Sequence, residues 1–171
     1  GIIVVNTNPL YTEREMEHQF NDSGAKALVL LANFGDKVER VVPKTGIKHV
    51  IVTNVGDMHC PLKRTLINTV LKYVKKEVPA ANIPGAIPLR KALSKGKGKP
   101  YTSAPATSED IAVLQYTGGT TGVAKGAMLT HGNLMANMAQ AYGVFKQVMN
   151  EGEETVICPL PLYHIYAFTM H

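Results

Sequence analysis

The sequence has few of the residues that build disulfide frameworks or metal centres. Among its 171 residues are two cysteines, Cys60 and Cys158, which lie far apart and outside any CxxC pair. Isolated cysteines indicate unpaired thiols in a reducing compartment, so we expect a cytoplasmic protein. The six histidines show no metal-ligand spacing, which argues against a zinc site.

Acidic residues are scarce in one segment, residues 63–99. This segment holds ten Lys and Arg residues against a single acid, Glu77, a net charge of +9 in a chain whose total is +5. Because the basic character belongs to one part of the chain, nucleic-acid binding by the whole protein loses support.

Charge is absent from residues 126–145, a span long enough to cross a membrane. Polar groups lie along this span, on His131, Asn133, Asn137 and Gln140, so we expect a helix of a globular protein instead.

Hydrophobic residues make up 45% of the chain, enough for one domain with a core. Both ends of the sequence are apolar, whereas natural termini are usually polar and exposed, and this predicts a piece of a larger protein.

Short β-branched runs alternate with segments of helical period along most of the chain. The expected strands are apolar on both faces, as a parallel sheet covered by helices requires. The predicted fold class is therefore α/β, with a mostly parallel, doubly wound sheet. We expect strands at 2–5, 27–31, 50–53, 111–115 and 155–158, and helices at 12–22, 35–42, 62–78 and 131–149.

Three parts are expected along the chain. They are a βαβαβα half at 1–78, a mobile connection at 79–108 rich in Pro and Lys, and a strand, loop, helix and following strand at 109–171. The connection holds five of the ten prolines. It cannot bury much, and a short helix at 89–93 is the most that we predict there.

The helix predicted at 62–78 has an apolar half and a basic half. Such a helix is expected to cover a sheet and to turn its lysines to solvent. The alternative is contact of residues 62–99 with an anionic membrane, the inner face of the cell membrane. This alternative stays open because Lys63 interrupts the apolar half and a lysine-rich loop follows.

A segment rich in glycine and threonine follows the strand expected at 111–115. Residues 116–126 have the sequence YTGGTTGVAKG. Glycines let backbone N–H groups approach an anion closely, while threonine hydroxyls and Lys125 add hydrogen bonds and positive charge, so the segment suits a polyphosphate. Neither GxxxxGK[ST] nor GxGxxG fits its spacing. A surface turn is the alternative.

This segment closely resembles the YT[SG]GTTGxxKG signature of the acyl-adenylate-forming superfamily, which includes acyl-CoA synthetases, luciferases and peptide-synthetase adenylation domains. Gly119 and Ala124 stand where many members have Ser and Pro, and both variants look most like bacterial long-chain fatty-acid CoA ligases. The resemblance implies a subdomain of the large N-terminal domain of such an enzyme. Residues 8–12, 110–112, 129–134 and 161–164 resemble other segments of the family.

Enzymes of this family are understood to join a carboxylate to AMP with Mg²⁺ and ATP, to release pyrophosphate, and then to pass the acyl group to coenzyme A. The resemblance implies that this chain holds the ATP phosphates, whereas Mg²⁺, fatty acid and coenzyme A belong to the parent enzyme. It implies catalytic roles for Lys125 and His164. The implied binding residues are Tyr116, Thr117, Gly118, Gly119, Thr120, Thr121, Gly122, Val123, Ala124, Lys125, Gly126 and Ala127.

Further sites of the family lie outside this sequence, so the chain alone is not expected to form thioesters. For His164 a place in the core is the alternative to a site role. Thr130 is predicted to cap the helix that follows the loop, with His131 at its start. A free-standing α/β module that binds phosphate or nucleotide without catalysis is the alternative to a ligase fragment.

Overall fold

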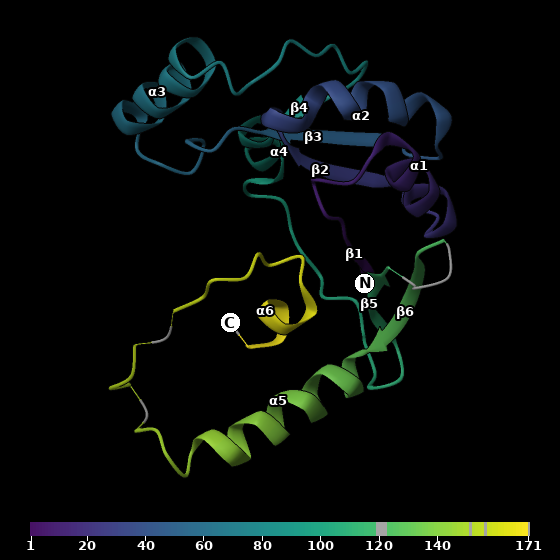
Figure 1. Cartoon of the computed structure of the whole chain (residues 1–171), viewed down its shortest axis with the longest axis vertical. Helices are drawn as coiled ribbons and strands as arrows, with labels where there is room; N and C mark the ends of the chain where they lie inside the picture. The colour runs from purple at the N-terminus through teal and green to yellow at the C-terminus, as the bar shows by residue number, and fades with distance from the viewer. Residues whose placement is uncertain (119–122, 151, 156, 171) are drawn as a thin grey trace. The chain divides into compact units, whose positions relative to one another are not determined.

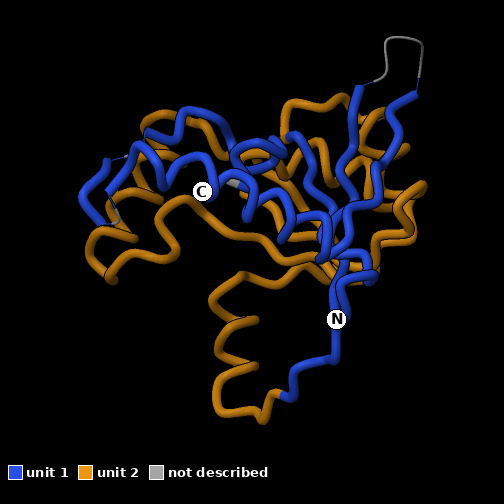
Figure 2. Tube along the Cα trace, turned by 90° about the horizontal axis from the view of Figure 1, so that it is seen from below, with its two compact units in different colours: residues 1–8, 102–171 blue, residues 9–101 orange. Residues whose placement is uncertain are grey.

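The computed structural model describes residues 1–118, 123–150, 152–155 and 157–170. It forms two compact units, residues 1–8 with 102–171, and residues 9–101 (Figure 2). Each unit contains one three-stranded sheet. The α/β class is confirmed, but the strands do not form the single doubly wound sheet that the sequence predicts, because the first strand pairs with the fifth instead of the second.

The unit of residues 9–101 has a parallel sheet of order β2-β3-β4 (Figure 1). One core cluster joins Met16 and Phe20 to Val41, and a second one contains Leu30, Val38 and Val50. The elements are α1 (Glu13–Asp22), β2 (Ala27–Leu31), α2 (Gly35–Val41), β3 (His49–Thr53), α3 (Pro61–Thr69), β4 (Ile87–Pro88) and α4 (Leu89–Gly96), with 3-10 turns at Ala32–Phe34 and Val42–Lys44.

Helix α1 begins and ends where the sequence predicts. The Thr12 hydroxyl accepts a hydrogen bond from the backbone N–H of Glu15 (3.3 Å), and the Glu15 carboxylate accepts one from the N–H of Thr12 (2.7 Å). This reciprocal pair satisfies backbone donors that the first helical turn leaves free. Gly24, with φ 63°, follows the helix in a conformation that favours glycine.

Helix α3 differs from its prediction in length and in packing. It continues as a π-helical turn, Val70–Val74, and ends four residues before the predicted position. Leu62, Leu66 and Tyr73 are exposed, so the prediction that this helix covers a sheet with its apolar half is wrong for these side chains. Helix α4 confirms the predicted short helix and extends it to Gly96.

The unit of residues 1–8 and 102–171 has the sheet order β1-β5-β6, with β5 parallel to β1 and antiparallel to β6. Lys125–Thr130, expected as loop, is a strand. The strand expected at 155–158 is wrong for the described residues Thr155, Ile157 and Cys158, which belong to neither sheet. The elements are β1 (Val4–Asn6), β5 (Ile111–Thr117), β6 (Lys125–Thr130), α5 (His131–Phe145) and α6 (Ile165–Met170).

Within the described ranges, no helix combines the length and the apolar character needed to cross a membrane. The same residues contain no group of three or more His, Cys, Asp or Glu side chains that could hold a metal ion.

Candidate phosphate-binding site

The glycine- and threonine-rich segment forms the end of a β-hairpin. Strands β5 and β6 pair up to Thr117 and Lys125, so residues 118–124 connect them (Figure 1). Residues 119–122 lie outside the described residues. The phosphate contacts that the resemblance implies for Gly119, Thr120, Thr121 and Gly122 therefore stay predictions.

The base of the hairpin is closed by a tyrosine ring packed against a glycine. Tyr116 pairs in register with Gly126 and is 6% exposed. A Cβ atom at Gly126 would lie 2.9 Å from Cε2 of the Tyr116 ring, closer than such atoms pack. Tyr116 and Gly126 therefore fix the spacing of the two strands where the loop begins and ends, which is a structural contribution to the site.

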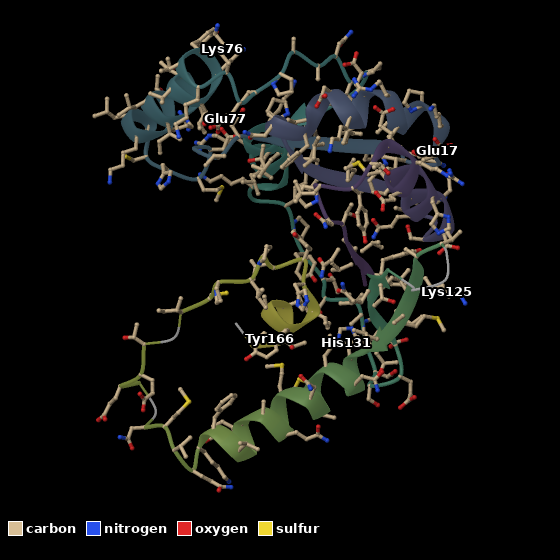
Figure 3. All side chains as sticks on the ribbon, viewed as in Figure 1. Glu17, Lys76, Glu77, Lys125, His131 and Tyr166 are labelled. Carbon is tan, nitrogen blue, oxygen red and sulfur yellow. The ribbon has the colours of Figure 1, made fainter. Side chains whose placement is uncertain are left out.

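The residues that flank the undescribed part of the loop are open to solvent. Thr117, Gly118, Val123 and Lys125 are exposed, and Ala124 is half-buried. Figure 3 shows Lys125 at the outer end of the hairpin. An exposed ammonium group beside backbone N–H groups suits an anion, since loops of this kind bind phosphate through both. Ala127 is exposed on β6 and offers only its backbone to a ligand.

Thr130 caps helix α5, as predicted from the sequence. Its hydroxyl accepts a hydrogen bond from the N–H of Asn133 (3.1 Å), and the Asn133 side chain accepts one from the N–H of Thr130 (3.1 Å). His131 is the first residue of α5. Its N–H donates to the carbonyl of Asp110 (3.0 Å). Hydrogen bonds from Thr107 lower the pKa of Asp110, with a smaller contribution from the charge of His131.

His164 lies in an exposed segment that leads into α6. Its Nδ1 accepts a hydrogen bond from the N–H of Tyr166 (3.3 Å) and so satisfies a free donor of the first turn of α6. Because Nδ1 is the acceptor, the neutral imidazole carries its proton on Nε2. The exposed ring argues against the core position considered as an alternative, and its Nε2–H is available as a donor.

A glutamine that the sequence analysis missed joins the hairpin to the His164 segment. Nε2 of Gln115 on β5 donates to the carbonyl of Tyr163 at 3.2 Å. Its Oε1 is buried and has no hydrogen-bond partner among the described residues. Gln115 is the one amide in the strand at 111–117, a signal that could have drawn attention to it. The strand that enters the phosphate loop thus also holds the residue next to His164.

Beside α6 lies a cavity of about 560 Å³, which the sequence analysis did not predict. It lies between α5 and α6, and Tyr166 points from α6 toward α5 (Figure 3). Its walls combine apolar side chains with a few uncharged polar groups, a composition typical of sites for small apolar ligands. The lining residues are Leu129, Asn133, Leu134, Asn137, Gln140, Ala141, Val144, Ile165, Tyr166 and Thr169.

Comparisons with known proteins agree with one another. The family model described as AMP-binding enzyme matches residues 1–171. The chain is 52% identical over 171 residues to a long-chain-fatty-acid–CoA ligase of Salmonella typhimurium, covering 100% of this chain and 30% of that protein. It is 32% identical over 170 residues to the ligase of the same name from Bacillus subtilis, with 99% and 30% covered.

Solved structures give the same picture. A long-chain-fatty-acid-CoA ligase from Archaeoglobus fulgidus is 27% identical, with a TM-score of 0.60 over 97% of this chain and 27% of that one. A structure described as a putative long-chain-fatty-acid CoA ligase from Rhodopseudomonas palustris has a TM-score of 0.70 over 98% of this chain and 34% of its own, and at 17% identity it supports the fold alone. The chain spans about 30% of the length of the curated relatives that it matches.

Proposed function

The chain belongs to the AMP-binding enzyme family, and from this we propose that it is part of an ATP-dependent fatty-acid CoA ligase. The reaction would convert fatty acid, ATP and coenzyme A to acyl-CoA, AMP and pyrophosphate through an acyl-adenylate. One observation carries the proposal: β5 leads into the phosphate loop and, through Gln115, holds the segment of His164 beside an apolar cavity. Elements attached to one strand, β5, would thus bind both the phosphates and the acyl chain.

The loop would act on the pyrophosphate side of adenylation. Negative charge grows on the leaving pyrophosphate as the carboxylate attacks the α-phosphate, and donors aimed at that charge lower the barrier. Lys125 would supply the mobile positive charge, and the backbone of 117–124 the N–H donors. The Nε2–H of His164 would donate to the carboxylate or the adenylate.

Mg²⁺ is expected for the parent enzyme. The residues described in this chain contain no group of three or more His, Cys, Asp or Glu side chains, and Mg²⁺ in such enzymes is held largely by substrate phosphates and water with one or two carboxylates, so no Mg²⁺ ligand is assigned in this part of the chain. No step of the reaction is therefore assigned to a metal held by this part of the chain.

The cavity between α5 and α6 would receive part of the fatty acyl chain. Leu134, Val144 and Ile165 offer apolar contact, and the amides of Asn133 and Asn137 lie in its wall. Burying an alkyl chain against apolar side chains is favourable by ~0.8 kcal/mol per CH₂ group, which suits a substrate made mostly of CH₂ groups.

The test is ATP–pyrophosphate exchange driven by a fatty acid in the full-length protein. Lys125→Ala is expected to lower the exchange rate about a hundredfold, as loss of one group that stabilises developing charge does. Lys48→Ala, which removes an exposed lysine of the other unit, serves as the control and should exchange at the normal rate. An unchanged rate for Lys125→Ala would contradict the assigned role.

The alternative, a phosphate- or nucleotide-binding module without catalysis, predicts another outcome of the same test. ATP would bind to the full-length protein, but no fatty acid would drive exchange. The 171-residue chain by itself is expected to form no acyl-CoA, because it spans about 30% of the length of the ligases it resembles.

A second candidate function is peripheral contact with an anionic membrane through residues 62–99. It is favoured by the exposed apolar side chains of α3 within a segment of net charge +9. We further propose that the protein is cytoplasmic, since both cysteines are free and exposed and such thiols suit a reducing compartment.

A further inference from the structure

We propose that helix α3, together with the π-helical turn that continues it, is the element that docks on an anionic membrane surface, through one stripe formed by Leu62, Leu66 and Tyr73. This inference rests on the membrane contact proposed for residues 62–99 and names the helix and the side chains that make it. The other parts of that segment, including α4 and the lysine-rich loop, would contribute charge only.

Two of the three side chains share one face of α3. Leu62 and Leu66 lie four residues apart, a spacing that places side chains above one another on a helix, and Tyr73 lies in the π-helical turn that continues α3. Leu62 is 82% exposed, Leu66 64% and Tyr73 66%. A contiguous exposed apolar stripe on a polar helix marks an interaction surface, whereas single exposed apolar residues do not.

The opposite face of α3 is fixed to the rest of its unit. The Asn68 side chain accepts a hydrogen bond from the N–H of Gly56 (2.9 Å) and donates to Oδ1 of Asp57 (3.1 Å). A Cβ at Gly56 would lie 2.6 Å from Oδ1 of Asn68 and 3.0 Å from the carbonyl of Arg64, so the glycine permits the close approach. The helix therefore cannot turn its apolar stripe inward without losing these bonds.

Asp57 secures this anchor. It is 6% exposed, and its carboxylate accepts from Asn68, from the N–H of Asn54 (2.9 Å) and from Thr53 (3.3 Å). Its backbone carbonyl accepts from Arg90 at the start of α4 (3.0 Å). The turn before α3 is thus tied to three elements, and the orientation of the helix follows from it.

Lysines flank the stripe. Lys63 lies next to Leu62 on α3, Lys72 lies beside Tyr73 in the π-helical turn, and Lys76, with φ 54°, follows the end of that turn. The Lys72 ammonium lies 5.4 Å from the centre of the Tyr73 ring. Figure 3 labels Lys76 and Glu77 at the end of the helix, and this glutamate pairs with Lys75 at 3.9 Å. No acidic residue occurs between Pro61 and Lys76.

The charge decides which occupant fits the stripe. A protein partner that covered it would bury or pair the flanking lysines at fixed positions, and unpaired buried ammonium groups are costly. Anionic lipid headgroups pair with such lysines without a fixed geometry, while the aliphatic stems of the lysines lie along the apolar surface. Tyrosine is also enriched at the level of the headgroups. An interfacial helix lying in the plane of the membrane satisfies all these groups together.

The test is sedimentation of the full-length protein with vesicles of phosphatidylcholine alone and of equal parts phosphatidylcholine and phosphatidylglycerol. The wild type should pellet with the anionic vesicles only. The double substitution Leu62→Ser/Leu66→Ser should weaken this partition about tenfold, because the apolar part of the contact is removed while the charge is unchanged. Met135→Ser/Met138→Ser removes another exposed apolar pair, from α5, whose residues 131–145 include no lysine, and should pellet like the wild type.

A fluorescence measurement places the helix directly. Residues 1–171 contain no tryptophan, so in the full-length protein, with any tryptophan outside these residues replaced by phenylalanine, Leu66→Trp introduces a single indole, whose emission should shift to the blue with anionic vesicles. The emission of Met135→Trp should not shift with the same vesicles. Circular dichroism of each variant checks the fold, and exposed positions are expected to leave it unchanged.

Two outcomes separate the inference from the proposal on which it rests. If the wild type pellets with neither kind of vesicle, or equally with both, the proposed contact with an anionic membrane is wrong. If the wild type prefers anionic vesicles but the Leu62→Ser/Leu66→Ser variant pellets equally well, contact exists and α3 does not make it. A stripe used for self-association would give a concentration-dependent mass that this variant loses, with no vesicle binding, and that result would also overturn the inference.

Discussion

Gly126→Ala tests the packing at the base of the phosphate loop. The added Cβ would lie 2.9 Å from Cε2, 3.0 Å from Cζ and 3.3 Å from the hydroxyl oxygen of Tyr116. The ring is 6% exposed and cannot swing away without losing its burial. Overpacking of this kind costs ~1–3 kcal/mol, and replacing glycine inside a strand regains ~0.5–1 kcal/mol. We therefore expect a net loss of ~1–2 kcal/mol in the free energy of unfolding.

The assay is urea unfolding of the wild type and of two matched variants. Gly118→Ala is the control, because a Cβ there meets no atom within 4 Å, and it should change the free energy of unfolding by less than ~0.5 kcal/mol. In a double-mutant cycle, Tyr116→Leu should remove most of the penalty of Gly126→Ala, since the contact is then gone. Equal stability of the two alanine variants would refute the reasoning, because it would mean that the ring does not pin the hairpin.

Two further predictions concern buried polar groups. Gln115→Leu in the full-length protein should lower kcat for the proposed adenylation about fivefold with the KM for ATP unchanged, because ~1 kcal/mol of hydrogen bonding to Tyr163 is lost. A raised KM for ATP would place Gln115 in nucleotide binding instead. Burial alone raises the pKa of Asp57, but hydrogen bonds led by the N–H of Asn54 outweigh it and hold the pKa below its ordinary value. The stability that the ionised carboxylate gives is complete above about pH 4 and is lost as pH falls through the lowered pKa. In Asp57→Asn the free energy of unfolding should therefore fall less steeply with decreasing pH, as measured by circular dichroism. The same pH dependence in this variant and in the wild type would contradict the prediction.

Features set by neighbouring residues were predictable from the sequence. The Thr12 and Thr130 caps depend on side chains three residues away, and both form as expected. Strand β2 has the predicted bounds because its apolar run is continuous and ends at a turn. The phosphate loop could also be located, since its signature occupies consecutive positions between β5 and β6.

Features that depend on distant partners were not predictable. Strand β6 exists because Lys125–Thr130 finds β5 beside it, whereas the β-branched residues Thr155 and Ile157 lie in no strand. The bond from Gln115 to Tyr163 joins residues 48 apart, and no local pattern reports such a contact. The exposed stripe of α3 was missed because amphipathicity shows that a helix has an apolar face, but not what covers it.

The position of Gln115 has a consequence for the reaction proposed here. Adenylation requires the carboxylate to lie in line with the bond from the α-phosphate to the leaving pyrophosphate. The loop that would hold the pyrophosphate and the segment that carries His164 are both attached to β5, two residues apart on that strand. A rigid strand with a hydrogen bond on one side and a hairpin loop at its end fixes their separation better than two independent loops could. The buried Oε1 of Gln115 has no hydrogen-bond partner among the described residues, and a buried acceptor without a donor costs ~1–3 kcal/mol. A donor from the substrate or from the rest of the protein would stabilise this link during the reaction.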